Sequence, residues 1–262
     1  MSERLVTSFD GYRLNVRDEG KADGPAVVFS HAVGGSLAMF DGQVPAFGDR
    51  FRVIRFDTRG HGGSDAPDGE YSMDMLGRDV ISIMDALGVA KAHFVGLSQG
   101  GMTGMWLGAH APERIDHLVL ANTTAHIPAF DMLNGWVKTA LTEGLDGIAP
   151  PTMNNWLGPK FKAANPGKTH ELVEGFRTMS TTGFAGVIAA MRDSDRTPDL
   201  PNIKAPTLVI AGLDDGPMGA VAADNLVKLI PGAQRADIAD AAHLSAVENP
   251  AGFNAAVLAF LG

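Results

Sequence analysis

Short apolar segments of strand length alternate with longer amphipathic segments along most of this chain, and this alternation limits the fold more than any other feature. Five segments are rich in β-branched or aromatic residues and are bounded by Gly, Pro, Asp or Asn, which predicts strands over residues 25–30, 51–57, 92–97, 115–122 and 205–213. Helical periodicity predicts helices over residues 72–88, 99–110, 220–229 and 249–261. Such alternation predicts an α/β fold with a mostly parallel sheet covered on both faces.

One segment interrupts the alternation. Between residues 125 and 199 no strand-like run occurs, and the helical pattern is broken by Pro-Pro, Gly-Pro and Pro-Gly pairs. We therefore expect one α/β core made of residues 1–124 and 200–262, with a helical cap insertion over 125–199. The length of 262 residues is compatible with a single core of this kind.

Composition excludes several classes of function. The chain has no cysteine, which rules out disulfide scaffolds, cysteine-ligated metals and cysteine nucleophiles. A formal net charge of −9 argues against a nucleic-acid partner, because binding phosphates needs a basic surface. No apolar run has the length of a signal peptide core or a membrane span, so we expect a cytoplasmic protein with no membrane partner. The oligomeric state stays open, a homo-oligomer included.

The segment Gly96-Leu97-Ser98-Gln99-Gly100 fits the pattern G-x-S-x-G at the junction of a predicted strand and a predicted helix. In this context the pattern is typical of a nucleophile elbow, a sharp turn that projects the serine hydroxyl out of the sheet. The two glycines leave room where side chains would collide with the neighbouring strand and helix. A glycine-rich turn with an incidental serine is the alternative, which the strand–helix context disfavours.

A serine hydroxyl needs an adjacent base, and in this arrangement an acid and then a histidine follow the serine along the chain. His243 lies in a loop before the last predicted helix, where the base is expected. Asp214 and Asp215 both follow the predicted strand 205–213. We favour Asp215 as the acid because it matches the common G-x-x-D arrangement, and Asp214 stays an alternative.

Two glycine-containing loops follow the predicted strands 25–30 and 51–57. The loop 30–35 suits an oxyanion hole formed by the backbone N–H groups of Val33 and Gln99. The loop 57–64 lacks the lysine of a phosphate-binding P-loop, and no G-x-G-x-x-G follows a strand, so no nucleotide cofactor is predicted. We interpret this second loop as structural, with Asp57 and Arg59 in polar contacts beneath the site.

The segments HAVGGS, FDTRGHGGSD, GLSQGG and AAHLSAVENP resemble the α/β-hydrolase superfamily. Within it, the chain is most similar to 3-oxoadipate enol-lactonases, from about Gly24 to the end. The resemblance implies an eight-stranded, mostly parallel sheet with a helical cap, and no metal or organic cofactor. It also implies Ser98 as nucleophile, His243 as base, Asp215 as acid, and Val33 and Gln99 as oxyanion donors.

The resemblance further implies a small-molecule ester or lactone that is hydrolysed through an acyl-enzyme. Trp136, Trp156, Met102 and Lys138 are the expected pocket residues. Enol-lactone substrates are anionic, so a cation in the cap should matter. The family's cap usually carries an arginine three residues after a tryptophan, whereas Trp136 is followed by Lys138 and Thr139. The candidates to replace that arginine are Lys138, Arg177 and Arg192.

Other functions use the same residues. A general carboxylesterase, a perhydrolase or a C–C bond hydrolase would need the same serine, histidine and aspartate. A protein of another class, a non-catalytic ligand-binding protein on this fold, is disfavoured because the full set of three residues is intact.

Overall fold

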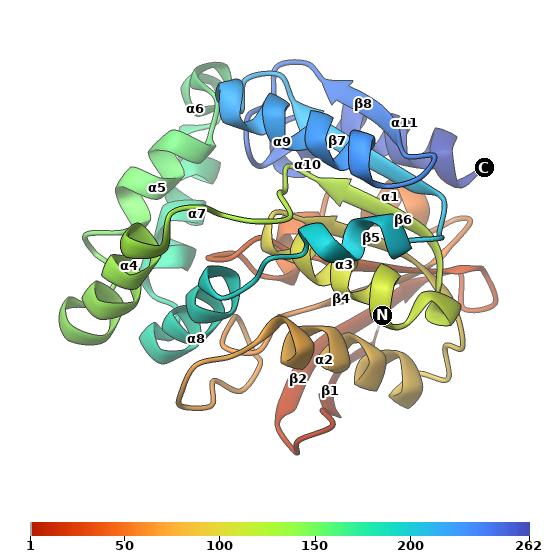
Figure 1. Ribbon diagram of the computed structural model, residues 1–262, viewed down its shortest axis with the longest axis horizontal. Coiled ribbons are helices and arrows are strands. Elements are labelled where there is room, and N and C mark those ends of the chain that lie inside the picture. Colours follow the sequence, from red (N-terminus) through yellow and green to blue (C-terminus); the bar gives the residue numbers. More distant parts are fainter. Residues whose placement is uncertain (1) are drawn as a thin grey trace.

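The chain folds around one sheet that is parallel except at one edge (Figure 1). The computed structural model describes residues 2–262, so Met1, the first residue of the expected core, lies outside the described residues. Within them the sheet has eight strands in the order β1-β2-β4-β3-β5-β6-β7-β8, and only β1 with β2 and β2 with β4 pair antiparallel. This confirms the predicted fold class. The strands are β1 Ser2–Thr7, β2 Arg13–Gly20, β3 Ala26–Ser30, β4 Arg52–Phe56, β5 Ala92–Leu97, β6 Ile115–Ala121, β7 Thr207–Gly212 and β8 Gln234–Ile238.

The five strands predicted from apolar runs are β3 to β7, which form the inner part of the sheet. Every residue of β3, β5 and β7 is buried, because helices cover both faces. The edge strands β1 and β8, and β2 next to β1, were not predicted. In β2 the charged residues Asp18 and Glu19 are stabilised by ion pairs with Arg52 and Arg55 of β4. The sequence of β2 therefore lacks the apolar run by which the inner strands were predicted.

Helices α2, α3 and α9 lie in front of the sheet in Figure 1, and α1 and α11 lie behind it. These layers bury the apolar faces of the strands, the main stabilising term for a domain of this size. The predicted helices over 72–88, 99–110, 220–229 and 249–261 correspond to α2, α3, α9 and α11. The bounds are α1 Val44–Phe47, α2 Met73–Ala86, α3 Gln99–His110, α9 Gly216–Leu229, α10 Ser245–Glu248 and α11 Pro250–Leu261.

Five helices between β6 and β7, here called the cap helices, gather at one end of the sheet (Figure 1). An isolated β-bridge between His126 and Asp195 joins the two ends of this segment. The division of the chain into core and insertion domains stays a prediction. No helix in the described part of the chain is long and apolar enough to cross a membrane. The cap helices are α4 Phe130–Glu143, α5 Ala149–Trp156, α6 Pro159–Ala164, α7 Pro166–Arg177 and α8 Thr181–Arg192.

Candidate active site

Ser98 lies in the turn between β5 and α3 with a backbone conformation that side chains rarely adopt, φ 56° and ψ −114°. The turn is held by hydrogen bonds on both sides of the residue. The Ser98 N–H donates to the carbonyl of Ala121 at 2.8 Å, and the Thr123 hydroxyl donates to the Ser98 carbonyl at 2.6 Å. A strained turn that is held in this way fixes the direction of the serine side chain.

The glycines of the motif make this turn sterically possible. A Cβ on Gly96 would lie 2.2 Å from the carbonyl oxygen of Gly100, and one on Gly100 would lie 2.2 Å from that of Ser30. Both contacts are with backbone atoms, which cannot rotate away. The predicted collision of larger side chains at these positions is thereby confirmed.

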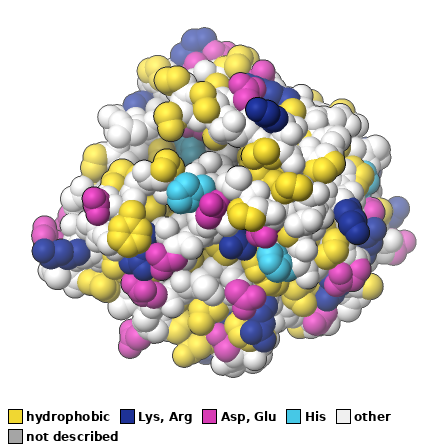
Figure 2. Space-filling model, viewed as in Figure 1, with side chains coloured by type: hydrophobic (Ala, Val, Ile, Leu, Met, Phe, Trp, Pro, Cys, Tyr) yellow, Lys and Arg dark blue, Asp and Glu magenta, His cyan; other side chains and the backbone are white. Residues whose placement is uncertain are grey.

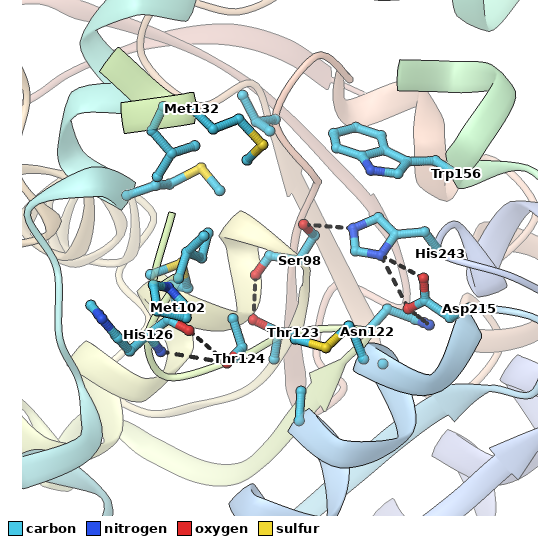
Figure 3. Close-up of a pocket in the computed structure, with 18 of the residues that line it drawn as sticks. Ser98, Met102, Asn122, Thr123, Thr124, His126, Met132, Trp156, Asp215 and His243 are labelled. Carbon is cyan, nitrogen blue, oxygen red and sulfur yellow. Dashed lines mark hydrogen bonds and ion pairs between the residues drawn. The ribbon is translucent and has the colours of Figure 1, made fainter. Parts of the chain in front are cut away.

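His243 and Asp215 lie beside the serine in a continuous line (Figure 3). Nε2 of His243 is 2.9 Å from Oγ of Ser98, and Nδ1 is 3.1 and 3.2 Å from the two carboxylate oxygens of Asp215. The loop between β8 and α10 carries His243, and Asp215 is the N-cap residue of α9. Asp214 is exposed and has no contact with His243, so of the two aspartates it is Asp215 that orients the imidazole.

Asn122 is a residue of the site that the sequence reading missed. It follows β6 with φ 45°, and its amide nitrogen donates to Asp215 Oδ2 and to the Ala242 carbonyl, both at 3.0 Å. Its amide oxygen accepts from the hydroxyl of Ser245 at 2.5 Å. One amide group therefore connects Asp215 to the loop that carries His243. A polar residue directly after a central strand was the available signal.

Glu248 and Trp156 hold the histidine loop from the other side. The Glu248 carboxylate accepts backbone N–H groups of Ala242, Leu244 and Gly158 at 3.0, 3.1 and 2.6 Å. Burial nevertheless raises the pKa of Glu248 above its ordinary value. The Trp156 ring lies 4.9 Å from the His243 ring, centre to centre, and its carbonyl accepts the His243 N–H at 2.9 Å. Trp156 of the cap helices thus contributes directly to the position of His243.

The loop that carries Val33 is fixed by two buried histidines. Nε2 of His61 accepts the N–H of Gly34 at 3.1 Å, and Nε2 of His31 accepts the N–H of Thr58 at 3.0 Å. Both bonds need an uncharged imidazole. Burial lowers the pKa of both histidines, to about 3 for His61, so both are neutral near pH 7.

The loop 57–64 is structural, as interpreted from the sequence. The Asp57 carboxylate accepts N–H groups of Leu37 and Gly63 at 2.7 and 2.9 Å. Arg59 is 1% exposed and forms ion pairs with Asp79 and Asp10 at 2.6 and 2.9 Å. These buried contacts hold the loop beside the residues that carry Val33.

A cavity of about 300 Å³ opens above Ser98, between the sheet and the cap helices. Figure 2 shows a hollow on the viewed face with hydrophobic and histidine side chains around it. The expected pocket residues Met102, Trp136 and Trp156 line the cavity. Val33 also lines it, together with Ser98, His243 and Asp215. Lys138 does not line it. It lies two residues after Trp136 on α4, about 200° further around the helix, and is exposed on the opposite face.

One group of side chains elsewhere has the composition of a metal site. Atoms of His93, Asp116 and His117 that could bind a metal lie within 4.8 Å of one another. The Lys91 ammonium already lies 3.2 Å from the Asp116 carboxylate. None of the three residues lines the cavity above Ser98.

Comparison with known proteins supports the same type of site. Residues 25–250 match the family described as the alpha/beta hydrolase fold. A curated relative, 3-oxoadipate enol-lactonase 2 of Acinetobacter baylyi, is 37% identical over 248 residues, which cover 95% of this chain and 92% of the relative. This agrees with the resemblance described from the sequence motifs.

Two solved structures are similar over almost their whole length. The enol-lactonase from Burkholderia xenovorans has a TM-score of 0.93 at 33% identity, with 98% of this chain and 99% of that chain covered. A hydrolase from Pseudomonas aeruginosa also has a TM-score of 0.93, at 37% identity, with 100% and 98% covered. The arrangement of sheet and cap helices is therefore shared with enzymes of known structure.

Proposed function

Since this chain belongs to the α/β-hydrolase fold family and hydrolyses a carboxylic ester or a lactone, we propose that Ser98 is its nucleophile. His243 takes the proton of the Ser98 hydroxyl as the oxygen attacks the carbonyl carbon. Asp215 keeps the imidazole in the required tautomer and stabilises the imidazolium that forms. The observation that carries the proposal is the continuous line from Ser98 Oγ through His243 to the Asp215 carboxylate, with 2.9 Å between serine and histidine.

The backbone N–H groups of Val33 and Gln99 stabilise the oxyanion in this proposal. Gln99 is the first residue of α3, so its N–H has no partner within the helix. Val33 is fully buried beside Ser98 in the loop that His31 and His61 hold, which supports a preorganised donor. Removing one such donor costs about 3 kcal/mol of transition-state stabilisation in enzymes where it has been measured.

When the first tetrahedral intermediate collapses, the single bond between the former carbonyl carbon and the leaving oxygen breaks. The leaving oxygen takes the proton from His243. In an ester the alcohol departs, whereas in a lactone it stays attached to the acyl chain. Water then attacks the acyl-serine and gives its proton to His243. The second intermediate releases Ser98 and a carboxylic acid, so the histidine acts as base and acid in turn.

The relatives named as 3-oxoadipate enol-lactonases favour a lactone or an ester of an enol as the substrate. The leaving oxygen of such a substrate is an enolate, which is a better leaving group than a simple alkoxide. The chemistry at Ser98 is the same for a simple ester, so we expect activated esters to report on the same site.

A neutral p-nitrophenyl alkylphosphonate tests the proposed nucleophile. We expect one equivalent of p-nitrophenol to be released, with the added mass on the peptide that contains Ser98. Ser98→Ala should prevent labelling and lower kcat for p-nitrophenyl esters by about four to six orders of magnitude. His243→Ala should also prevent labelling, because the hydroxyl then has no base.

Ser82→Ala on α2 is a matched control, since its hydroxyl donates to the carbonyl of Arg78 on the same helix and Ser82 does not line the cavity. This variant should be labelled and active like the parent chain. Labelling of Ser98→Ala, or undiminished labelling of His243→Ala, would contradict the proposed roles.

A further inference from the structure

We propose that the cavity takes an uncharged acyl group, so that the ester or lactone hydrolysed here carries no carboxylate or phosphate of its own. This inference rests on the proposed serine mechanism and adds the substrate class to it. It is opposite to the anionic substrate that the resemblance to enol-lactonases led us to expect.

The residues that line the cavity include no lysine or arginine. Their one carboxylate, Asp215, already contacts His243 and Asn122. The hydroxyls of Thr123 and Thr124 donate to the carbonyls of Ser98 and His126. The surface that remains for a substrate is therefore mainly apolar, with Met102, Ile127, Met132, Leu133, Trp136 and Met191.

Two of the cations expected to replace the missing arginine are bound elsewhere. Arg192, at the end of α8, has a side chain only 9% exposed and pairs with Glu70 at 3.1 Å and with Asp193 at 2.6 Å. Arg177, at the end of α7, pairs with Glu174 at 2.8 Å and with Asp146 at 3.0 Å. Neither guanidinium lines the cavity, and each already has two carboxylates.

The third candidate, Lys138, is exposed on the face of α4 that is opposite to Trp136. The other cations of the insertion also contact groups outside the cavity. Lys160 pairs with Asp240, Lys162 contacts Asn154, Lys168 pairs with Glu171, and Arg196 pairs with Asp199. In the described part of the chain, then, every lysine and arginine of residues 125–199 lies off the cavity.

An anionic substrate would be penalised twice in this cavity. Its charge would lose water without gaining a cation, which is costly in apolar surroundings. It would also be repelled by Asp215 nearby and by a chain of net charge −9 at longer range. At the N-terminus of α9 an anion would meet the Asp215 carboxylate, which lies 3.0 Å from the position of a Cβ on Gly219 in the first turn.

Besides His243, the described cavity lining contains one further histidine, His126. It is exposed at the cavity, and its Nδ1 lies 3.3 Å from the carbonyl oxygen of Ser194. His126→Gln replaces the imidazole by an uncharged amide and serves as the matching variant.

Two p-nitrophenyl esters of equal length test the inference. One is the mono-p-nitrophenyl ester of adipic acid, which ends in a carboxylate. The other is p-nitrophenyl 6-oxoheptanoate, which ends in a methyl ketone of nearly the same shape. We expect kcat/KM for the ketone to exceed that for the carboxylate by at least about 100-fold, mainly through KM. The same ratio is expected for His126→Gln.

Similar or better hydrolysis of the carboxylate, with Ser98 still labelled by the phosphonate, would overturn the inference and leave the serine mechanism in place. Labelling without hydrolysis of either ester would overturn it too, because the neutral chain is the expected ligand. Failure of both labelling and hydrolysis would instead contradict the proposed function.

A new cation in the cavity provides the reciprocal test. Met132 on α4 lines the cavity and is 48% exposed, so an arginine there can extend into the cavity while its backbone stays in place. Met132→Arg should raise kcat/KM for the carboxylate ester by about 10-fold or more. Met132→Gln, polar but uncharged, should not. An equal effect of both variants would show that polarity, not charge, was limiting.

Discussion

Asn122 joins three parts of the active site through one side chain. Its side chain connects the Asp215 carboxylate, the carbonyl of Ala242 and the hydroxyl of Ser245. In the proposed mechanism it acts through Asp215, so we expect it to be a positioning residue. Its left-handed backbone, φ 45°, is one that glycine adopts without strain.

Asn122→Gly therefore removes the amide group and keeps the backbone conformation. We expect kcat to fall by about 10- to 100-fold, the effect of losing a hydrogen bond to a charged group. KM should change less than kcat, since the amide nitrogen and oxygen both already bind protein groups. Steady-state kinetics measure both, and thermal unfolding controls for loss of folded protein. A parallel loss of stability with unchanged kcat per folded molecule would contradict a positioning role.

Ser98 and His243 could be predicted because their signals are local. The motif occupies five consecutive residues, and the chain order then selects His243 among eight histidines. Asn122 and Glu248 were missed because neither belongs to a motif, and their contacts join segments 93 and 90 residues apart. Lys138 was expected in the pocket but lies outside it. Its spacing of two residues from Trp136 puts the two side chains on opposite faces of α4.

At the scale of elements, the inner strands were predictable because burial on both faces demands continuous apolar runs. The strands β1, β2 and β8 were not predictable, because they lack a continuous apolar run. Charged side chains in β2 and β8 are stabilised by ion pairs instead. In β8 all but Ile238 are at least partly exposed, and Arg235 pairs with Asp224 and Asp237. The cap helices show a further feature that sequence hides, namely close backbone contact between α8 and the core.

Gly183 of α8 packs directly on Gly60 of the loop 57–64. A Cβ on Gly183 would lie 2.2 Å from the Gly60 carbonyl oxygen, so Gly183→Ala must displace α8. We expect a loss of about 1–3 kcal/mol in the free energy of unfolding. KM should also rise, because α8 carries Met191 of the cavity lining. Urea unfolding and steady-state kinetics measure the two effects.

Gly175→Ala is the matched control on α7. Apart from its chain neighbours and the backbone of its own helix, no atom lies within 4 Å of a Cβ at that position. Removing a glycine from a helix interior should stabilise the chain by about 0.5–1 kcal/mol. If Gly183→Ala behaved like this control, the close contact would not restrain α8.

For the whole molecule, the buried histidines make stability depend on pH. The pKa of His61 is lowered to about 3 by burial and by the neighbouring His31. The folded state therefore binds fewer protons than the unfolded state between about pH 6.5 and pH 3. Stability from this residue is complete above that window and is lost as the pH falls through it, by up to about 5 kcal/mol.

His61→Asn isolates this contribution, because an asparagine amide can accept the Gly34 N–H without titrating. The free energy of unfolding of the parent chain should decrease more between pH 7 and pH 5 than that of the variant, by about 2 kcal/mol. Other titrating groups are common to both proteins, such as Asp79, whose pKa burial raises to about 6. Equal pH dependence of the two proteins in urea titrations would exclude His61 as the source.

The absence of lysine and arginine from the described cavity lining also has a consequence for turnover. Hydrolysis converts a neutral ligand into a carboxylate at the moment of its release, beside Asp215 and inside a chain of net charge −9. The enzyme then holds its product less well than its substrate. We expect the acid product to inhibit with a Ki at least about 10-fold above KM, whereas its uncharged primary amide inhibits more strongly. Progress curves would then stay close to linear at high conversion, so the reaction clears its own site by changing the charge of what it binds.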